Sequence, residues 1–336
     1  RRVFINDSVC EGCGDCGVQA NCVAIEPLET PLGRKRQINQ SACNKDFSCV
    51  EGFCPSFVTV EGGSLRRGRG PQLDDRAINI PLPLPQLPSL EQPYAILVTG
   101  IGGTGVVTIG QILGMAAYLE AKAVTTLDMA GLAQKNGAVM SFVRLARRVE
   151  DLHAPRIATG GAHAVLGCDL VVTAGSEALA KLGPRSRAIV NVASTPTADF
   201  TRNTEWTFPL GAMESAIADR VGREQASFID ATRIATALLG DAIASNFFLL
   251  GFAWQSGAIP LGLAAIEAAI RLNDTAVEQN LRAFLWGRRA AVDRAAVLSF
   301  VDADQQAQSA SPNSFAALLE HRRELLCAYQ NQAPAT

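Results

Sequence analysis

The chain has 336 residues, 48% of them apolar, and a formal net charge of -2 at pH 7. This length predicts two or three soluble globular domains, and the composition is apolar enough for a sizeable core. The balanced charge gives no support for binding to nucleic acid or to an anionic membrane surface. Two basic runs, Arg34-Lys35-Arg36 and residues 66–69, are interpreted as local solvated loops.

Seven of the nine cysteines lie within the first 54 residues. A disulfide framework would require a secreted protein, and the sequence shows no signal peptide, so we expect a reducing, cytoplasmic location. The sequence starts without methionine, which suggests part of a longer protein. Cys168 and Cys327 lie far from the others and are expected to be small buried apolar side chains.

Residues 1–62 contain an internal repeat. The motif I-N-x-S-x-C occurs at residues 5–10 and again, 33 residues later, at residues 38–43. Superposing the copies pairs three positions: Cys10 with Cys43, Cys13 with Asp46, and Cys16 with Cys49. An aspartate therefore stands where the first copy has a cysteine.

The first copy has the pattern C-x2-C-x2-C at residues 10–16, with Cys22 six positions later. Three thiolates so spaced on a loop can bind three corners of one iron–sulfur cluster, whereas zinc sites usually combine two distant pairs. Gly12, Gly14 and Gly17 allow the loop to curl and to direct N–H groups at the sulfurs. We interpret the block as iron–sulfur ligands, with zinc as the alternative.

Bacterial two-cluster ferredoxins exchange their fourth ligands, because the cysteine that precedes a proline binds the other cluster. Cys54 precedes Pro55, so the same crossing can be applied here. The predicted ligands are Cys10, Cys13, Cys16 and Cys54 for the first site, and Cys22, Cys43, Asp46 and Cys49 for the second.

Asp46 is interpreted as an oxygen ligand of a second four-iron cluster, or as the neighbour of a three-iron cluster whose fourth corner is empty. A carboxylate would make the fourth iron more labile than a thiolate would. In the alternative, the second site has decayed and Asp46 is a solvated acid. The retained register of three cysteines in the second site favours a working cluster.

Short β-prone runs at residues 23–25 and Phe57–Val60 follow the two halves of the repeat. The core of this domain is so small that metal must help to hold it together. Residues 63–92 are rich in Gly, Arg and Pro and are expected to be a linker, with a semi-rigid polyproline spacer at residues 81–88.

From residue 93, apolar β-prone runs alternate with helical stretches, as is typical of an α/β domain with a mainly parallel sheet. Helices predominate from residue 226 to about 288, and the domain is expected to end near residue 300. Residues 301–336 are predicted to form a polar loop and a last helix at 315–329, the start of a further region. Strands are predicted at residues 95–99, 124–127, 139–145, 170–173 and 188–192.

The predicted fold class is therefore α/β: a small two-cluster ferredoxin-like α+β domain, then a Rossmann-like, mainly parallel sheet with C-terminal helices. Residues 94–119 and 242–266 carry no charge and are long enough to span a bilayer. Glycines interrupt the first and polar residues with Pro260 interrupt the second, whereas a spanning helix must satisfy its backbone throughout. We expect a buried strand-loop-helix and a buried helical pair instead.

A glycine-rich loop lies between a predicted strand and a predicted helix, where backbone N–H groups and the helix dipole can bind a phosphate. The candidate cofactor-binding residues are Gly100, Gly102, Gly103, Thr104 and Gly105. A dinucleotide fold would also need an acidic residue after the second strand, for which Asp128 is the candidate. The alternative is a tight turn without a ligand. His153, His163 and His321 share no metal spacing, and no catalytic residue is predicted.

The cysteine block, followed by V-T-G-I-G-G-T-G at residues 98–105, resembles the 2-oxoacid:ferredoxin oxidoreductases. The chain is most similar to the long fused indolepyruvate ferredoxin oxidoreductases of bacteria. The resemblance covers nearly the whole chain. Its runs are residues 10–19, 43–49, 52–63, 131–139 and 283–289.

The resemblance implies an enzyme that decarboxylates an arylpyruvate on thiamine diphosphate, passes electrons singly through iron–sulfur clusters to ferredoxin, and transfers the acyl group to coenzyme A. Residues 1–62 would be the electron relay, and residues 93–300 the γ domain of the family. The thiamine-binding G-D-G…N pattern is absent; the nearest run, Gly240-Asp241-Ala242, lacks its second glycine. Thiamine diphosphate and Mg would therefore belong to other domains of a homo-oligomeric parent.

Two other interpretations stay open. One is an iron–sulfur dehydrogenase that binds NAD or FAD through the glycine loop, which predicts NADH binding that is lost on Gly102→Val. The other is a non-catalytic ferredoxin-type scaffold, which predicts redox-active clusters but no ligand at the loop.

Overall fold

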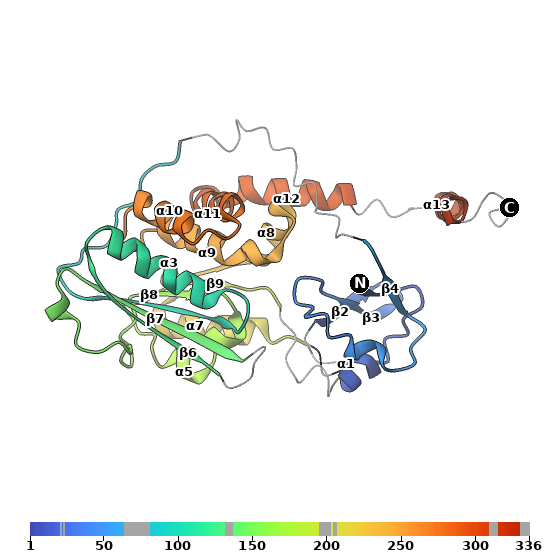
Figure 1. Ribbon diagram of the computed structural model, residues 1–336, viewed down its shortest axis with the longest axis horizontal. Helices are drawn as coiled ribbons and strands as arrows, with labels where there is room; N and C mark the ends of the chain where they lie inside the picture. The colour runs from blue at the N-terminus through green and yellow to red at the C-terminus, as the bar shows by residue number, and fades with distance from the viewer. Residues whose placement is uncertain are drawn as a thin grey trace.

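The computed structural model describes residues 1–20, 22, 24–63, 81–131, 137–194, 203, 207–308 and 315–329. A small N-terminal unit, built on the cysteine repeat, precedes a larger α/β unit (Figure 1). The basic run at residues 66–69 and the middle of the run at 131–139 lie outside the described residues.

Two antiparallel strand pairs form the N-terminal unit, β1 with β4 and β2 with β3. Each pair contains one strand from each half of the repeat: Ile5 lies opposite Phe57, and its repeat equivalent Ile38 lies opposite Ile25. The expected strand at 57–60 is confirmed; in the run at 23–25, Ile25 is the first residue of β2, and residue 23 lies outside the described residues. The elements are β1 Arg2–Ile5, α1 Asp15–Ala20, β2 Ile25–Thr30, β3 Gly33–Ile38, the 3-10 helix η1 Ser48–Val50, and β4 Phe57–Val60.

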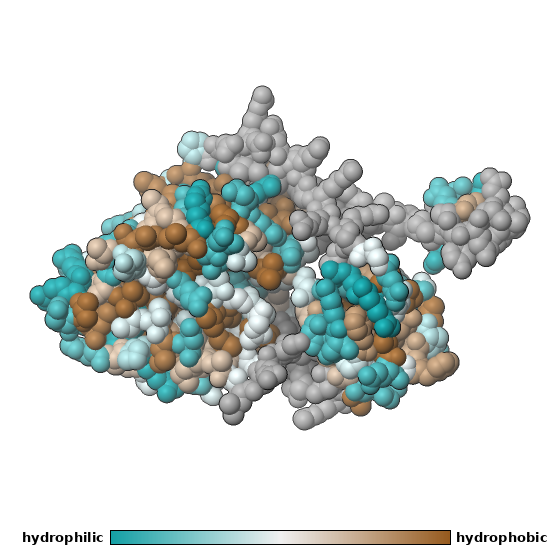
Figure 2. All heavy atoms as spheres, in the orientation of Figure 1, coloured by the Kyte–Doolittle hydropathy of each residue, from teal (hydrophilic) through white to brown (hydrophobic). Residues whose placement is uncertain are grey.

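The first basic run is not a solvated loop, so that interpretation was wrong. Residues 34–36 lie in β3, and Arg36 is 2% exposed. Figure 2 shows hydrophilic side chains gathered over β2 and β3; the exposed ones include Glu29 and Gln37. Sequence composition marks a basic run as polar but does not show which of its side chains the hairpin turns inward.

A six-stranded sheet in the order β10-β9-β8-β5-β7-β6 forms the centre of the second unit. β5, β8, β9 and β10 run parallel to one another, whereas β7 runs antiparallel to both β5 and β6. The mainly parallel sheet is confirmed. Its strands are β5 Tyr94–Ile101, β6 Ala123–Ala130, β7 Ala138–Ala146, β8 Ala164–Gly167, β9 Arg187–Asn191 and β10 Ala226–Ile229.

Four of the five predicted strands of this unit are confirmed as β5, β6, β7 and β9. The strand predicted at 170–173 is wrong, because these residues form the short helix α4, Leu170–Thr173. Its β-branched residues favour a strand, but the Asp169 side chain caps the helix by accepting from Val172 N at 2.8 Å. The four-residue strands β8 and β10 were not predicted.

Helices cover both faces of the sheet. The helices α3 and α8–α12 share one apolar core with it, while α4, α5 and α7 pack on the other face (Figure 1). The helices are α3 Val106–Leu119, α5 Ser176–Leu179, α7 Leu210–Val221, α8 Ala231–Leu239, α9 Ser245–Gln255, α10 Leu263–Leu272, α11 Val277–Val292, α12 Arg294–Gln308 and α13 Phe315–Tyr329, with 3-10 turns η2 Val149–Asp151, η3 Arg223–Gln225 and η4 Ala242–Ala244.

The two uncharged segments have the structures expected for them. The first forms β5, the glycine loop and α3, and the second forms η4, α9 and α10, with every residue of α9 buried. Over the described ranges, no helix combines the length and apolarity needed to cross a bilayer. The last predicted helix, 315–329, is confirmed as α13, whereas α12 continues to residue 308, into the stretch that was predicted to be a polar loop.

The described part of the predicted linker packs on the α/β unit. Gln255 Nε2 donates to the carbonyl oxygen of Pro83 at 2.5 Å, and Leu90 is 8% exposed within the core. Residues 64–80 lie outside the described chain. Residues 83–90 therefore contact the α/β unit at both ends, which the expected semi-rigid spacer would not do.

Candidate metal centres

The two cysteine loops share one backbone conformation. Gly12 and Gly14 have positive φ angles of 76° and 82°. Their repeat equivalents, Lys45 and Phe47, also have positive φ angles, of 61° and 62°. Each loop also begins with the same turn, in which an asparagine Oδ1 accepts from a serine N–H at 3.0 Å. The repeat is therefore structural as well as sequential, and Asp46 occupies the place of Cys13.

The left-handed conformation of Lys45 and Phe47 is costly. A side chain at positive φ costs roughly 1–2 kcal/mol, and such strain concentrates at functional sites. The second loop keeps the shape of the first without the glycines that make this shape easy to adopt. This conservation of shape within one chain supports a working second site over a decayed one.

Three of the first-site cysteines lie close together. Burial raises the pKa of the Cys16 thiol to about 11; the Arg36 guanidinium opposes this shift, and the neighbouring Cys10 and Cys13 add to it. Gly12 N donates to Cys10 Sγ at 3.4 Å. The fourth predicted ligand, Cys54, is exposed, with its Sγ 3.0 Å from the hydroxyl of Ser56.

The second-site residues also gather, although they come from both halves of the repeat. Burial raises the pKa of the Cys49 thiol, and Cys22 and Cys43 raise it further, with a smaller contribution from Asp46. The structure thus places Cys22, from the first half, beside the cysteines of the second half. This is the neighbourhood that crossed ligand sets require.

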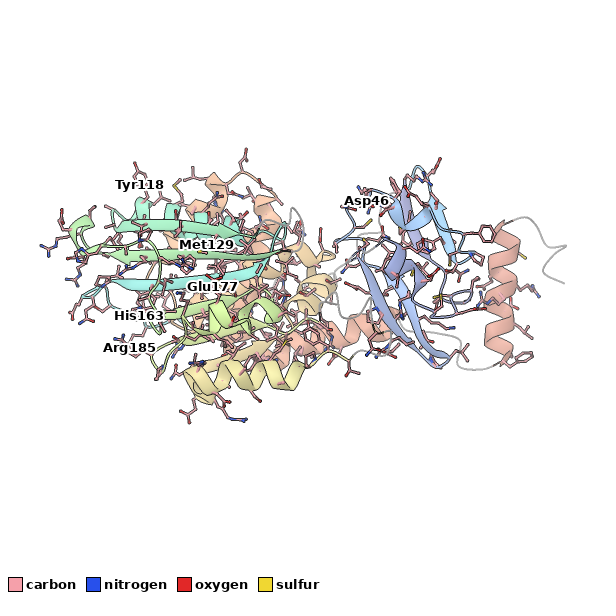
Figure 3. All side chains as sticks on the ribbon, turned by 90° about the horizontal axis from the view of Figure 1, so that it is seen from below. Asp46, Tyr118, Met129, His163, Glu177 and Arg185 are labelled. Carbon is pink, nitrogen blue, oxygen red and sulfur yellow. The ribbon has the colours of Figure 1, made fainter. Side chains whose placement is uncertain are left out.

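Asp46 lies exposed on its loop, far from His163 and Arg185 of the α/β unit (Figure 3). Its Oδ1 accepts from the backbone N of Ser48 at 3.1 Å and from the Ser48 hydroxyl at 3.0 Å, and its Oδ2 accepts from Asn44 Nδ2 at 2.8 Å. The carboxylate is therefore held by its own turn. It could bind iron only by sharing or giving up these hydrogen bonds.

The donor sets fit iron–sulfur clusters. Nowhere in the described ranges do three His, Cys, Asp or Glu side chains converge so that they could hold one metal ion. A four-iron cluster is instead surrounded by its thiolates. Gathered thiols, curled loops and an N–H directed at sulfur all fit such a cluster.

Sequence reasoning missed the strand that packs on the first loop. Lys35 Nζ donates to the carbonyl oxygen of Cys10 at 2.6 Å, and Arg36 lies near Cys16. The sequence did carry a signal for this contact, because both residues precede Ile38, which belongs to the repeated motif.

The glycine loop forms a tight turn at the carboxyl end of β5. Gly102 N donates to the carbonyl oxygen of Gly137 at 2.9 Å, and Asn246 Nδ2, from the start of α9, donates to the carbonyl oxygen of Thr104 at 2.8 Å. Gly103 and Gly105 have positive φ angles of 84° and 92°. Gly103 and Thr104 are exposed, so the tip of the loop is accessible to a ligand.

Asp128 does not lie where a dinucleotide fold would need it. It is exposed on β6, and the antiparallel strand β7 separates β6 from β5 and its glycine loop. In a dinucleotide-binding unit the ribose-binding acid follows the glycine loop within one parallel βαβ unit. The topology therefore disfavours the NAD or FAD interpretation.

Two other singled-out residues, Cys168 and His163, lie in the packed interior or at its edge. Cys168 is buried as expected, with a pKa raised to about 12 by burial and by Asp169, whereas Cys327 is only partly buried, contrary to expectation. His163 Nδ1 accepts from Ala95 N at 3.0 Å, and its ring stacks on Tyr94 at 4.8 Å. Burial, aided by Arg185 and Arg144, lowers the pKa of His163.

The second unit matches a known family. Residues 95–290 match the family described as "Pyruvate ferredoxin/flavodoxin oxidoreductase". Curated relatives named "Indolepyruvate oxidoreductase subunit IorB" include that of Methanothermobacter thermautotrophicus, 29% identical over 129 residues, which are 38% of this chain and 63% of the relative. That of Thermococcus kodakarensis is 32% identical over 78 residues, 23% of this chain and 37% of the relative. The chain thus covers less than two thirds of either relative.

Two crystal structures are also similar to this chain. The pyruvate oxidoreductase subunit PORC of Thermotoga maritima is 20% identical, with a TM-score of 0.43, over 59% of this chain and 97% of that one. The gamma subunit of a keto/oxoacid ferredoxin oxidoreductase from Geobacter sulfurreducens is 20% identical, with a TM-score of 0.42, over 59% and 98%. Because the family match spans more than half of its residues, this chain belongs to the pyruvate ferredoxin/flavodoxin oxidoreductase family.

Proposed function

We propose that the chain is the electron-relay and γ-domain part of an indolepyruvate, or other aryl 2-oxoacid, ferredoxin oxidoreductase. The observation that carries this proposal is the combination of two gathered groups of thiols at residues 10–49 with the family match at residues 95–290. The aryl substrate is supported by the names of the relatives. The reaction would be oxidative decarboxylation to an acyl-coenzyme A.

The N-terminal unit would hold two iron–sulfur clusters, which supply single-electron transfer when bound. Its residues do what such clusters need from a protein: they gather thiols, curl the backbone and supply N–H donors. The first set would be Cys10, Cys13, Cys16 and Cys54, and the second Cys22, Cys43, Asp46 and Cys49.

The other components of the reaction would lie outside this chain. Gly240 ends α8 in a left-handed conformation, and the Asp241 side chain caps η4 by accepting from Ile243 N, so this run has a structural role. Thiamine diphosphate and Mg would be bound by other domains of the parent protein, a cytoplasmic homo-oligomer. Coenzyme A would be the co-substrate and ferredoxin the electron acceptor.

The glycine loop is the proposed binding place for a phosphate-bearing ligand. Its exposed tip and its position before α3 support this role, while the internal hydrogen bonds of Gly102 and Thr104 reduce the number of available donors. Titration of the chain with coenzyme A and with NADH, each repeated on Gly102→Val, tests it. Binding of NADH alone would favour the dehydrogenase interpretation.

The test of the relay is metal content and spectroscopy of the anaerobically reconstituted chain. We expect two clusters' worth of iron and sulfide in each polypeptide. We also expect a three-iron EPR signal that Asp46→Cys converts to a four-iron signal, because a thiolate holds the fourth iron more firmly. Asp219→Cys, which adds a thiol on the exposed surface of α7, is the matched control and should change nothing.

One cluster's worth of iron, unchanged by Asp46→Cys, would show that the second loop holds no cluster.

A second measurement tests whether catalysis belongs to other domains of the parent protein. The isolated chain should not reduce a dye with indolepyruvate, and turnover by this chain alone would contradict the assignment of catalysis to other domains.

A further inference from the structure

The strand β3 packs directly on the first cysteine loop. A Cβ atom on Gly12 would collide with the carbonyl oxygen of Arg34, and Lys35 Nζ donates to the carbonyl oxygen of Cys10 at 2.6 Å. The next residue, Arg36, is 2% exposed. The backbone of β3 therefore lies against the proposed first cluster site and brings Lys35 and Arg36 to it, whereas the Arg34 side chain pairs with Glu29.

Arg36 brings its positive charge to this site. Its guanidinium stabilises the negative charge of a Cys16 thiolate, and it lowers the pKa of Cys16 against the larger effect of burial. Nη1 of Arg36 donates to the carbonyl oxygen of Lys35 at 3.1 Å. Because Arg36 is buried, solvent and salt screen this charge far less than they screen a surface charge.

The internal repeat shows what the second site has at the same position. Thirty-three residues before Arg36 stands Val3, which is 1% exposed in β1. The start of β1 lies on the second loop as β3 lies on the first, because the Arg1 guanidinium is 4.9 Å from the centre of the Phe47 ring. The first site thus has a buried cation where the second has a buried valine.

Most other charges near the two loops are exposed. Lys35 is half-buried, as is its repeat equivalent Arg2, and the half-buried Glu26 accepts from Asn39 Nδ2 at the start of the second loop. Glu11 and Asp15 lie on the first loop, and Lys45 and Asp46 on the second, all at the surface. Exposed charges interact weakly because water and salt screen them. Arg36 and Val3, both fully buried, are therefore the main charge difference between the strands that pack on the two loops.

We propose that Arg36 raises the reduction potential of the first-site cluster above that of the second, which makes the first site the electron sink of the pair. The proposal rests on the proposed function. In the transfer, one electron leaves the second cluster, which is oxidised, and enters the first, which is reduced. No proton or further reactant is needed, and the electrons come from 2-oxoacid oxidation in the parent protein or from dithionite in the test.

The test is an anaerobic redox titration of the reconstituted full chain, followed by EPR, with iron and sulfide measured in every sample. Arg36→Gln and Arg36→Met should lower the first-site potential, reducing the equilibrium constant for its reduction at least tenfold, which corresponds to 59 mV for one electron. Arg36→Lys should keep most of the potential because it keeps the charge. The second-site potential should not move.

The matched control removes an exposed ion pair from the same hairpin without changing the net charge. Glu29→Gln with Arg34→Gln deletes the pair between these side chains, and both potentials should stay in place. Its success would show that a disturbed β3 surface is not the cause of the shift.

Each outcome of this titration either supports or overturns the proposal. An unchanged first-site potential in Arg36→Gln with full iron content would overturn the proposal. If Arg36→Lys behaves like Arg36→Gln, the side chain acts through shape and hydrogen bonding, which also overturns it. If Gln and Met lose the first cluster while Lys retains it at the wild-type potential, the charge is supported as the requirement of that site. A wild-type chain that takes up no cluster would instead remove the proposed function, and the proposal with it.

Discussion

At the residue scale, the backbone of the second cysteine loop distinguishes Asp46 from an ordinary surface acid. Lys45 and Phe47 adopt positive φ angles that the first loop achieves with glycines. Exposed loops without a function usually relax such strain, since glycine, asparagine or a different turn removes it. The strain indicates that the fold keeps the backbone at residue 46 in a fixed position, independently of the side chain at that residue.

Replacing Lys45 with glycine should stabilise the N-terminal unit. The substitution removes strain of roughly 1–2 kcal/mol and adds an unfolded-state entropy cost of roughly 0.4–1 kcal/mol, so we expect a net gain of about 0.5–1 kcal/mol. Calorimetry of the anaerobically reconstituted chain measures it as a rise in the first transition temperature.

The matched control is Gln37→Gly, in the extended backbone of β3, where Gln37 is also exposed. Glycine within a strand costs about 0.5–1 kcal/mol, so this variant should be less stable. If both variants lose stability equally, the left-handed conformation of Lys45 is not a source of strain.

At the element scale, the close packing of α9 against α11 stabilises the apolar core of the second unit. A Cβ atom on Gly251 would collide with the carbonyl oxygen of Phe284, and one on Gly287 would collide with that of Phe248. The two glycines let the helix backbones touch. Asn246, at the start of α9, reaches the glycine loop, so this packing also positions the candidate ligand-binding turn.

Gly251→Ala should therefore destabilise the second unit by about 1–3 kcal/mol or more, because overpacking forces the helices apart. Tryptophan fluorescence during urea unfolding reports this change, since Trp254 and Trp286 lie on α9 and α11. Gly211→Ala, in α7, is the matched control: nothing lies within 4 Å of its added Cβ, so a gain of up to about 1 kcal/mol is expected. Equal losses in both variants would contradict the role of the helix crossing.

The elements show which features could be predicted from the sequence. Long buried runs such as β5 and β7 were predictable because their apolar pattern extends over most of the strand. The helix α4 was mistaken for a strand because four residues carry little periodicity and the capping role of Asp169 was not recognised. The short strands β8 and β10 depend on partners distant in sequence, which no local pattern reveals.

The candidate site was predictable to the extent that the repeat defined it. Spacing and the Cys54-Pro55 pair were enough to propose both ligand sets, and the structure gathers Cys22 with the second half. The burial of Arg36 was not predictable, since it depends on how the β2–β3 hairpin turns its side chains against the first loop. The role of Asn246 was likewise not predictable, because this residue lies in an uncharged helix and its hydrogen-bond partner, Thr104, is 142 residues earlier in the sequence.

At the scale of the whole molecule, the two units draw their stability from different sources. The buried apolar residues of the N-terminal unit, over its described part, are only Val3, Cys10, Ala24 and Ile25, whereas the α/β unit has two extended cores. An exposed hydrogen bond of 3.5 Å from Ser41 Oγ to Asp241 Oδ1 links them, and such a contact contributes little. We therefore expect the stability of the first unit to depend on the proposed clusters, and that of the second unit not to.

Removing the clusters with an oxidant and a chelator should lower the first unfolding transition and leave the second in place. A loss of about 2 kcal/mol would lower the transition temperature of a domain this small by about 8–16 °C. The chain allows the units to be followed separately, because Trp254 and Trp286 lie in α9 and α11 of the second unit, while calorimetry detects both units. Ser41→Ala, which removes this hydrogen bond, should move neither transition. If cluster removal lowers the tryptophan transition as well, the units are thermodynamically coupled, and the cluster sites support the family domain directly.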